Sequence, residues 1–297
     1  MYCAHFGLRE SPFGLTPDTE FAFPGVAHQE ALNVLLVASA AGEGFIKITG
    51  EVGMGKTLLC RRFLATLDDG YVAAYIPNPM LEPRGLLLAI ADEFNAGVDR
   101  NADNHQIIKS LNHALLDIAK QGKKAFVFVD EAQAMPVETL ETLRLLSNLE
   151  TEKCKLLQVI MFGQPELDAK LDLPSIRQLN QRITFQHHLG GLSKEETKRY
   201  VTHRLQVAGH VGDQLFATAA INALFRRTRG VPRLVNIIAH KALLAAYGEG
   251  KSRISRQHVV RAANDTPAVA RSTRSPVAGL VAATVVAVGL TLWFFVV

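Results

Sequence analysis

Cysteine is scarce in this sequence, and its few copies are widely separated. The chain of 297 residues has three cysteines, Cys3, Cys60 and Cys154, and no pair has the CxxC spacing of a metal or redox motif. The N-terminus shows no basic start, apolar run and cleavage site of the kind that marks a secretory signal. We therefore expect a reduced, cytoplasmic setting for the chain up to about residue 270.

The sequence also lacks fixed-period repeats and low-complexity tracts, which argues against a repeat protein. Hydrophobic residues make up 48% of the chain and charged residues 20%, as is usual for a globular protein that buries a core. Charge is unevenly distributed, because residues 189–275 hold 15 Lys and Arg against 5 Asp and Glu. This stretch therefore has a net charge of +10, which indicates contact with phosphates or anionic lipid, or else a solvated helical face.

Five short apolar runs, rich in β-branched and aromatic residues, have the character of strands. They lie at residues 44–49, 71–76, 124–130, 155–163 and 182–186. Longer segments with helical spacing separate them, which favours βαβ units and a mostly parallel sheet with helices on both faces. The sequence thus predicts an α/β domain over residues 1–189.

The pattern becomes all-helical after this domain. Ser193 and Glu196 have the spacing of a capping box, which predicts a helix through about Val207. Amphipathic stretches follow at 213–228, 231–247 and 255–264, with Gly209, Gly230 and Gly248 as breakers. We expect a small helical domain at residues 190–266 and a basic, polar linker at residues 267–275.

A glycine-rich octapeptide, GEVGMGKT, follows the first predicted strand and leads into a predicted helix. This is the context in which G-x-x-x-x-G-K-[ST] forms a phosphate-binding loop. The predicted nucleotide contacts are Gly50, Glu51, Val52, Gly53, Met54, Gly55, Lys56 and Thr57. The glycines allow backbone N–H groups to face phosphate oxygens at the positive end of a helix. Lys56 would neutralise the β- and γ-phosphates, and Thr57 would ligate Mg²⁺.

Two carboxylates end the third predicted strand, in the segment KAFVFVDEAQ. Ligands bind at the carboxyl edge of a parallel sheet, and this strand comes one interval after the phosphate loop. Asp130 would complete the Mg²⁺ shell, and Glu131 would act as general base on the attacking water. The sequence therefore predicts ATP hydrolysis with ATP and Mg²⁺ as ligands.

Three polar positions outside these motifs could also take part in nucleotide binding or hydrolysis. Gln164 ends the fourth predicted strand, where its side chain could reach the γ-phosphate or the water. Arg182, or alternatively Arg177, could project across a subunit boundary and stabilise charge on the transferring phosphoryl group. Arg233 opens a helix of the second domain and could reach the nucleotide from there.

The complete arrangement resembles the AAA+ ATPases, and within them the ExeA/GspA/MshM-like group of secretion and pilus-assembly ATPases. The matching segments are MYCAHFGLRESPFGLTPDTEFAF, HQEAL, GEVGMGKT, FVDEAQ, GQPEL, LNQRI, LSKEETKRYVTHRLQVAG and GVPRLVNIIAHKALLAAY. The resemblance implies an AAA+ αβα core with a helical lid, and homo-oligomers in which a neighbour's arginine completes each site. It makes Gln164 sensor 1, Arg182 the arginine finger and Arg233 sensor 2, and it places the HQEAL segment with His28 on the adenine side.

A final apolar segment points to a membrane. Residues 275–297 contain no charged residue, and at about 1.5 Å per residue a helix of this length reaches the roughly 30 Å of a hydrocarbon core. Arg271 and Arg274 flank its N-terminal side. The positive-inside rule then predicts a single-pass inner-membrane helix at residues 276–297, with the ATPase domain in the cytoplasm.

The sequence departs from the ExeA pattern, in which a peptidoglycan-binding domain follows the membrane helix. The MshM-like pilus-biogenesis members are therefore the closer comparison. We expect a membrane-anchored ATPase that assists assembly of a type II secretion or type IV (MSHA-like) pilus apparatus, with envelope secretion or pilus proteins as partners. One alternative is a DNA-binding AAA+ ATPase of the transposition-regulator type, although the apolar segment argues against nucleic acid. A second is a scaffold gated by nucleotide, in which hydrolysis is incidental.

Overall fold

The computed structural model describes residues 2–16, 18–42, 44–99, 101–151 and 155–272. The chain divides into two compact units. One comprises residues 16–191, and the other comprises residues 1–15 together with the chain from residue 192 onward. The two units are described separately below.

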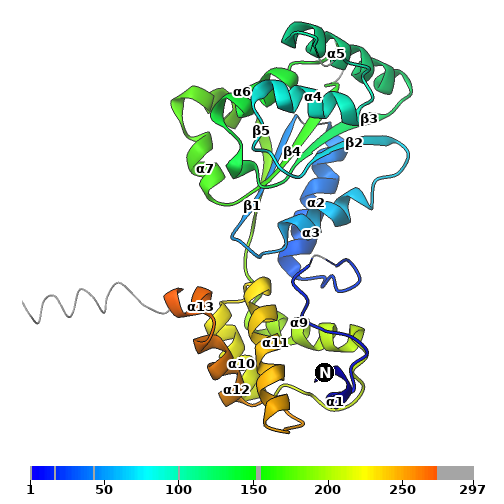
Figure 1. Ribbon diagram of the computed structural model, residues 1–297. Helices are drawn as coiled ribbons and strands as arrows, with labels where there is room; N and C mark the ends of the chain where they lie inside the picture. The colour runs from blue at the N-terminus through cyan, green and yellow to red at the C-terminus, as the bar shows by residue number, and fades with distance from the viewer. Residues whose placement is uncertain (1, 17, 43, 100, 152–154, 273–297) are drawn as a thin grey trace, which may run out of the picture. The chain divides into compact units, whose positions relative to one another are not determined.

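The unit of residues 16–191 is built on a five-stranded parallel sheet (Figure 1). Its strands are β1 (Phe45–Gly50), β2 (Tyr71–Ile76), β3 (Lys124–Val129), β4 (Leu157–Gly163) and β5 (Ile183–Leu189). Their order in the sheet is β2-β3-β4-β1-β5, and every neighbouring pair is parallel. The five predicted strands and the parallel α/β fold are thus confirmed, and β3 lies next to β4.

Helices cover both faces of this sheet. They are α2 (Val26–Ala41), α3 (Lys56–Leu64), α4 (Pro83–Glu93), α5 (Asn104–Lys120), α6 (Val137–Leu146), α7 (Glu166–Leu171) and α8 (Arg177–Asn180), with 3-10 turns η1 (Ala132–Ala134) and η2 (Pro174–Ile176). Successive side chains of a strand point to opposite faces. Phe126 and Phe128 of β3 accordingly meet Phe63 of α3, whereas Val127 and Val129 join the buried cluster formed with α4 to α8.

A buried ion pair fixes α7 to the central strand. Lys47 of β1 donates from Nζ to Asp168 Oδ1 of α7 at 2.6 Å, and only 9% of the lysine side chain is exposed. A buried charge without its partner is costly, so the pair determines where α7 can lie. The segment just before α7 contains Gln164, which is thereby positioned at the carboxyl end of β4.

The second unit is helical. It contains α1 (Tyr2–His5), α9 (Lys194–Val207), α10 (Thr218–Thr228), α11 (Pro232–Gly248), α12 (Arg256–Asn264) and α13 (Pro267–Ser272). The predicted capping box is present, because Ser193 Oγ accepts from the Glu196 N–H while Glu196 Oε2 accepts from the Ser193 N–H. The helix predicted over 213–228 begins only at Thr218, since Phe216 instead forms a bridge with Ile254.

The first fifteen residues correct the predicted domain range of 1–189, because they pack with the helical unit. Tyr2, Phe6, Leu8 and Phe13 are buried there, and their burial supplies the physical reason for the association. The predicted linker at 267–275 is also wrong in its described part, since α13 forms at Pro267–Ser272 and buries Val269.

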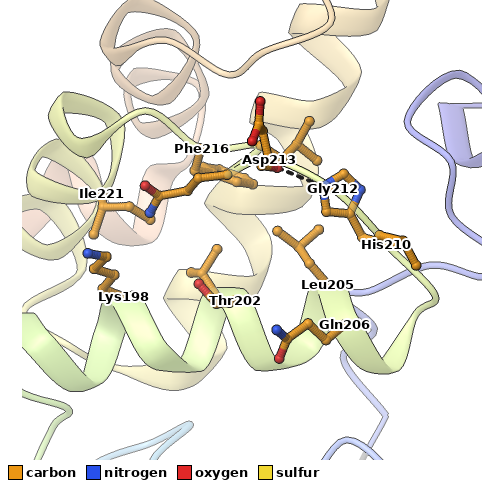
Figure 2. A pocket seen from close by; sticks show the side chains of 13 residues that line it. Lys198, Thr202, Leu205, Gln206, His210, Gly212, Asp213, Phe216 and Ile221 are labelled. Atoms are coloured by element: carbon orange, nitrogen blue, oxygen red, sulfur yellow. Dashed lines mark hydrogen bonds between the residues drawn. The ribbon is translucent and has the colours of Figure 1, made fainter.

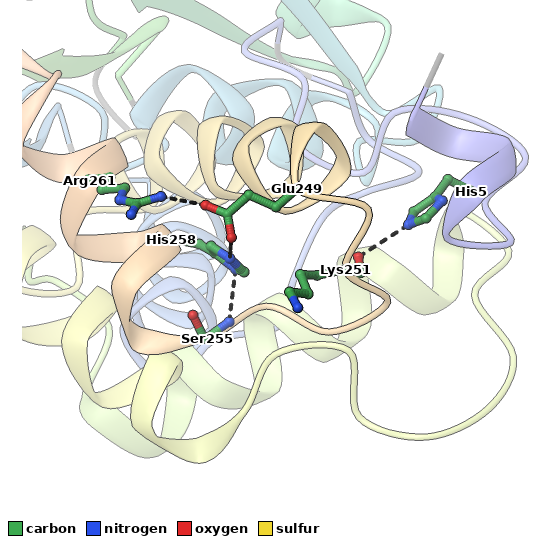
Figure 3. Close-up of polar contacts among 6 residues, drawn as sticks. All are labelled: His5, Glu249, Lys251, Ser255, His258 and Arg261. Carbon is green, nitrogen blue, oxygen red and sulfur yellow. Dashed lines mark hydrogen bonds and ion pairs between the residues drawn. The ribbon is translucent and has the colours of Figure 1, made fainter.

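Figure 3 shows the polar contacts that join α11, α12 and the N-terminal segment. Glu249, at the C-cap of α11, accepts hydrogen bonds from His258 Nε2 at 3.0 Å and from the guanidinium of Arg261. The hydrogen bond from His258 lowers the pKa of Glu249, and the charge of the Arg261 guanidinium acts in the same direction. His258 Nδ1 in turn accepts from the Ser255 N–H, and His5 contacts the carbonyl of Lys251. These hydrogen bonds hold the start of α12 against the end of α11.

Asn236 provides a test of the contact between the N-terminal segment and the helices. Its side chain is buried, donates to the Gly14 carbonyl at 3.2 Å and accepts from the Tyr200 hydroxyl at 2.9 Å. Asn236→Ala should lower the free energy of unfolding by about 1–3 kcal/mol, because buried polar groups lose their partners. Urea denaturation measures the change.

Asn222→Ala is the matched control. Among the described residues, Asn222 Oδ1 is buried without a hydrogen-bond partner, so its removal should cost less than about 0.5 kcal/mol. Equal losses in the two variants would contradict the role given to Asn236.

Within the described residues, none of the helices has the length and apolar character needed to cross a bilayer. The membrane helix predicted at residues 276–297 lies outside the described residues.

Candidate nucleotide site

The phosphate loop turns between the end of β1 at Gly50 and the start of α3 at Lys56. Gly53 and Gly55 have positive φ angles of 83° and 90°, which residues other than glycine rarely adopt. Gly55 is also crowded, since a Cβ atom there would lie 2.9 Å from His28 Nε2. As the N-cap residue of α3, Gly55 has no side chain to cap the helix, so the first N–H groups of α3 stay available to an anion.

His28 lies beside this loop. It belongs to α2, and its Nε2 is 2.8 Å from the carbonyl oxygen of Met54. The HQEAL segment, which was expected on the adenine side, therefore meets the backbone of the phosphate loop. This contact shapes the loop and leaves the adenine assignment a prediction.

Lys56 is buried, with 5% of the residue exposed, and is held by carbonyls of its own loop. Its Nζ donates to Gly50 O at 2.6 Å and to Glu51 O at 3.2 Å. Burial lowers the pKa of Lys56, while the carboxylates around it act in the opposite direction. They are Glu131, Asp130, Glu51 and Glu166. A phosphate group would offer this buried ammonium stronger acceptors than the two carbonyls.

Thr57 and Asp130 are in direct contact. Thr57 Oγ1 donates to Asp130 Oδ2 at 2.7 Å, and Asp130 is buried. Hydroxyl and carboxylate oxygens are the ligands that Mg²⁺ prefers, usually in combination with water and substrate phosphates. Among the described residues no group of three or more His, Cys, Asp or Glu could hold a metal alone. The pair therefore fits a magnesium ion that arrives with its nucleotide.

Tyr75 of β2 is a neighbour of Asp130 that sequence reasoning missed. Its hydroxyl donates to Asp130 Oδ2 at 3.4 Å. Burial and then the negative charge of Asp130 raise the pKa of Tyr75 to about 12, so the hydroxyl remains a donor at neutral pH. The contact follows from the register between β2 and β3, in which Tyr75 pairs with Phe128, two residues before Asp130. This register was not predicted from the sequence.

Glu131 adopts a left-handed conformation, with φ of 52°, just after β3. Its Oε2 accepts from Gln133 Nε2 at 2.6 Å and from Gln164 Nε2 at 3.0 Å. A non-glycine residue in this region carries strain that the surrounding contacts must offset, and such residues are frequent at functional sites. Gln164 thus lies beside Glu131, and Gln133 is a second amide that sequence reasoning missed.

Arg177 and Arg182 belong to this unit, whereas Arg233 belongs to the helical unit. Arg182 precedes β5, at the amino end of the sheet and opposite the phosphate loop, and donates to Ser147 Oγ at 2.8 Å. Arg177 is exposed at the start of α8. Arg233 is exposed at the start of α11, in the helical unit. The structure therefore brings together the predicted residues Lys56, Thr57, Asp130, Glu131 and Gln164, and within this unit it places neither Arg177 nor Arg182 among them.

A cavity of about 500 Å³ lies in the helical unit, between α9, the segment after it and α10 (Figure 2). Its floor is apolar, with Leu205, Phe216 and Ile221, and its rim is polar, with Lys198 and Asp213. It contains no phosphate-loop residue and no carboxylate pair. The nucleotide chemistry is therefore assigned to the phosphate loop and not to this cavity.

Comparisons with known proteins agree with this geometry. A family model described as an AAA domain matches residues 39–171. General secretion pathway protein A of Aeromonas hydrophila is 42% identical over 269 residues, which is 91% of this chain and 49% of the relative. The chain thus spans about half the length of the curated relative that it matches.

Solved structures share the fold at low sequence identity. Cdc6p from Pyrobaculum aerophilum has a TM-score of 0.62 at 17% identity and covers 84% of this chain and 70% of its own. The ORC2 protein of Aeropyrum pernix, in its ADPNP-ADP complexes, has a TM-score of 0.59 at 16% identity, covering 84% and 72%. The RuvB Holliday junction branch migration motor of Thermotoga maritima scores 0.52 at 17% identity, covering 79% and 67%. These likenesses concern the fold alone.

Proposed function

Because this chain belongs to the AAA+ ATPases and is related to General secretion pathway protein A, we propose that it hydrolyses ATP to assist assembly of a cell-envelope secretion or pilus apparatus. The observation that carries the nucleotide part is the contact of Thr57 with Asp130 beside the buried Lys56. The relationship over 91% of the chain supports the envelope part.

Phosphate binding, magnesium binding and proton transfer are assigned to different residues of the site. Lys56 and the N–H groups of the loop bind the phosphates, while Thr57 and Asp130 would hold Mg²⁺, which when bound would neutralise charge on the β- and γ-phosphates. Water attacks the γ-phosphorus and transfers its proton to Glu131, and the bond from the γ-phosphorus to the β–γ bridging oxygen breaks. ADP and inorganic phosphate are released. In this proposal Gln164 contacts the γ-phosphate as sensor 1. Arg233 of the helical unit contacts the nucleotide as sensor 2.

Arg182 is proposed to act in a neighbouring subunit, because it lies at the edge of the sheet opposite its own phosphate loop. Arg182→Ala should leave ATP affinity within about twofold and reduce oligomer-dependent turnover by about a thousandfold, in line with arginines supplied in trans elsewhere. Steady-state ATPase assays over a range of protein concentrations measure this.

Two controls accompany this variant. Ser147→Ala removes the hydrogen bond that Arg182 makes within its own chain and should keep turnover. Arg177→Ala tests the alternative arginine. If turnover fell only in Arg177→Ala, the finger would be Arg177; if neither variant lost turnover, no arginine of this pair would act in trans.

The membrane part of the proposal rests on residues 276–297 and on the basic residues before them. An uncharged run of this length is proposed to anchor the ATPase to the inner membrane on its cytoplasmic side. The net charge of +10 over residues 189–275 favours an anionic leaflet, at about 1 kcal/mol for each basic residue near the surface.

Crosslinking in membranes tests the proposed function. The full chain and its Lys56→Ala variant are expressed, fractionated and crosslinked with and without Mg·ATP, and captured proteins are identified. The proposal predicts recovery with membranes and ATP-dependent capture of envelope assembly proteins by the wild type alone. Recovery in the soluble fraction, with DNA binding that weakens steeply as salt rises, would favour the DNA-binding alternative.

A further inference from the structure

Gln133 is tied to both parts of the hydrolytic machinery. Its side-chain Nε2 donates to Glu131 Oε2 at 2.6 Å, and its Oε1 accepts from the backbone N–H of Gln164 at 2.9 Å. One amide group therefore joins the carboxylate after β3 to the residue that follows β4. Since β3 and β4 are neighbours in the sheet, this bond spans two adjacent strand ends at the edge where the phosphate loop lies.

The backbone of Gln133 is also held in place. Lys170 of α7 donates from Nζ to the carbonyl of Gln133 at 2.6 Å and to that of Met135 at 2.7 Å. The same α7 is fixed to β1 through the ion pair of Asp168 with Lys47. Lys170 thus ties the 3-10 turn η1 to α7 through two carbonyls, which holds the backbone of Gln133 in place.

Glu131 depends on such support. Its backbone is in the left-handed region, and its side chain is only partly buried. Its carboxylate receives both amide donors on the same oxygen, Oε2. If Gln164 turns its side-chain amide toward a γ-phosphate, it leaves Oε2, and Gln133 is then the donor that remains. The backbone N–H of Gln164 keeps Gln133 in place during this change, because it binds Oε1 independently of the Gln164 side chain.

We propose that Gln133 is a positioning residue for hydrolysis, which holds the Glu131 carboxylate toward the attacking water while the Gln164 amide moves between Glu131 and the γ-phosphate. The inference rests on the proposed role of Glu131 as general base. A base must lie within hydrogen-bond reach of the proton that it takes, and small misplacements cost large factors in rate. In this proposal Gln133 acts through Glu131.

Gln133→Met tests this, because methionine has nearly the same size and no amide. In the full chain, kcat for ATP should fall about tenfold, while KM and the Kd for Mg·ATP stay within about twofold. Gln133→Glu, which has the same length but puts an acceptor against Glu131, should lower kcat at least as much. Gln121→Met, the same replacement at an exposed C-cap of α5, should leave kcat, KM and Kd unchanged.

The outcomes separate the inference from the function on which it rests. If Glu131→Gln loses turnover and Gln133→Met keeps full kcat, Gln133 has no positioning role. A rise in KM and Kd at unchanged kcat would likewise overturn the proposal, since it would make Gln133 a support for binding. If Glu131→Gln itself keeps turnover, the proposed general base fails instead. Retained Mg·ATP affinity in both Gln133 variants excludes misfolding as the cause of a lower kcat.

Discussion

Glu131→Gln should bind Mg·ATP about as tightly as the wild type and lose turnover by a factor of about 10² to 10⁴. The replacement keeps the size of the side chain and an oxygen that can accept from Gln133 and Gln164, so the site should keep its shape. It removes the carboxylate that takes the proton from water. Phosphate release under saturating ATP measures turnover, and equilibrium titration measures affinity.

Comparison with Lys56→Ala turns this result into a test of mechanism. Lys56→Ala should lose binding and turnover together, because the buried ammonium neutralises phosphate charge. A nucleotide-gated scaffold would keep its cellular function in Glu131→Gln and lose it in Lys56→Ala. A machine driven by hydrolysis would lose function in both. Turnover at the wild-type rate in Glu131→Gln would remove Glu131 from the mechanism.

Gly230→Ala should be the most destabilising single substitution in the helical unit, at more than about 4 kcal/mol. Gly230 has a φ of +76°, and a Cβ atom there would lie 1.9 Å from the carbonyl oxygen of Leu192. The two backbones also share a hydrogen bond, from the Leu192 N–H to Gly230 O at 2.9 Å. The clash involves backbone on both sides, so no side-chain rotation relieves it. Urea denaturation followed by circular dichroism measures the loss of helix.

Gly248→Ala is the control for this substitution. Gly248 is the last residue of α11, and a Cβ atom there meets nothing within 4 Å. Alanine favours helix over glycine by about 1 kcal/mol in a helix interior, so this variant should be neutral or slightly more stable. Similar unfolding midpoints for both variants would mean that the approach of Gly230 to Leu192 is not as close as described.

Local patterns made much of the fold predictable. The loop at residues 50–57, the carboxylates after β3 and the capping box from Ser193 to Glu196 each depend on residues close in sequence. The five strands were recognisable because buried parallel strands form short apolar runs. The structure places β3 beside β4, which brings Gln164 next to Glu131.

Contacts between distant residues could not be predicted in the same way. Residues 1–15 pack with helices some two hundred positions later, as in the contact of Asn236 with Gly14. Tyr75 reaches Asp130 through strand register, and Gln133 reaches Gln164 through a turn whose course depends on Lys170. The Arg182 hydrogen bond with Ser147 is of the same kind. Such contacts follow from packing, and no local pattern encodes them.

We infer that Lys56, Thr57 and Asp130 bind a magnesium-bound triphosphate at the carboxyl edge of the sheet. Calorimetric titration of Mg·ATP into Glu131→Gln protein, with and without Lys56→Ala, tests this inference. We expect one nucleotide bound per chain, with an affinity that falls about tenfold to a hundredfold when Lys56 is removed. Absence of any binding heat before Lys56 is removed, or equal affinity in the two proteins, would contradict it.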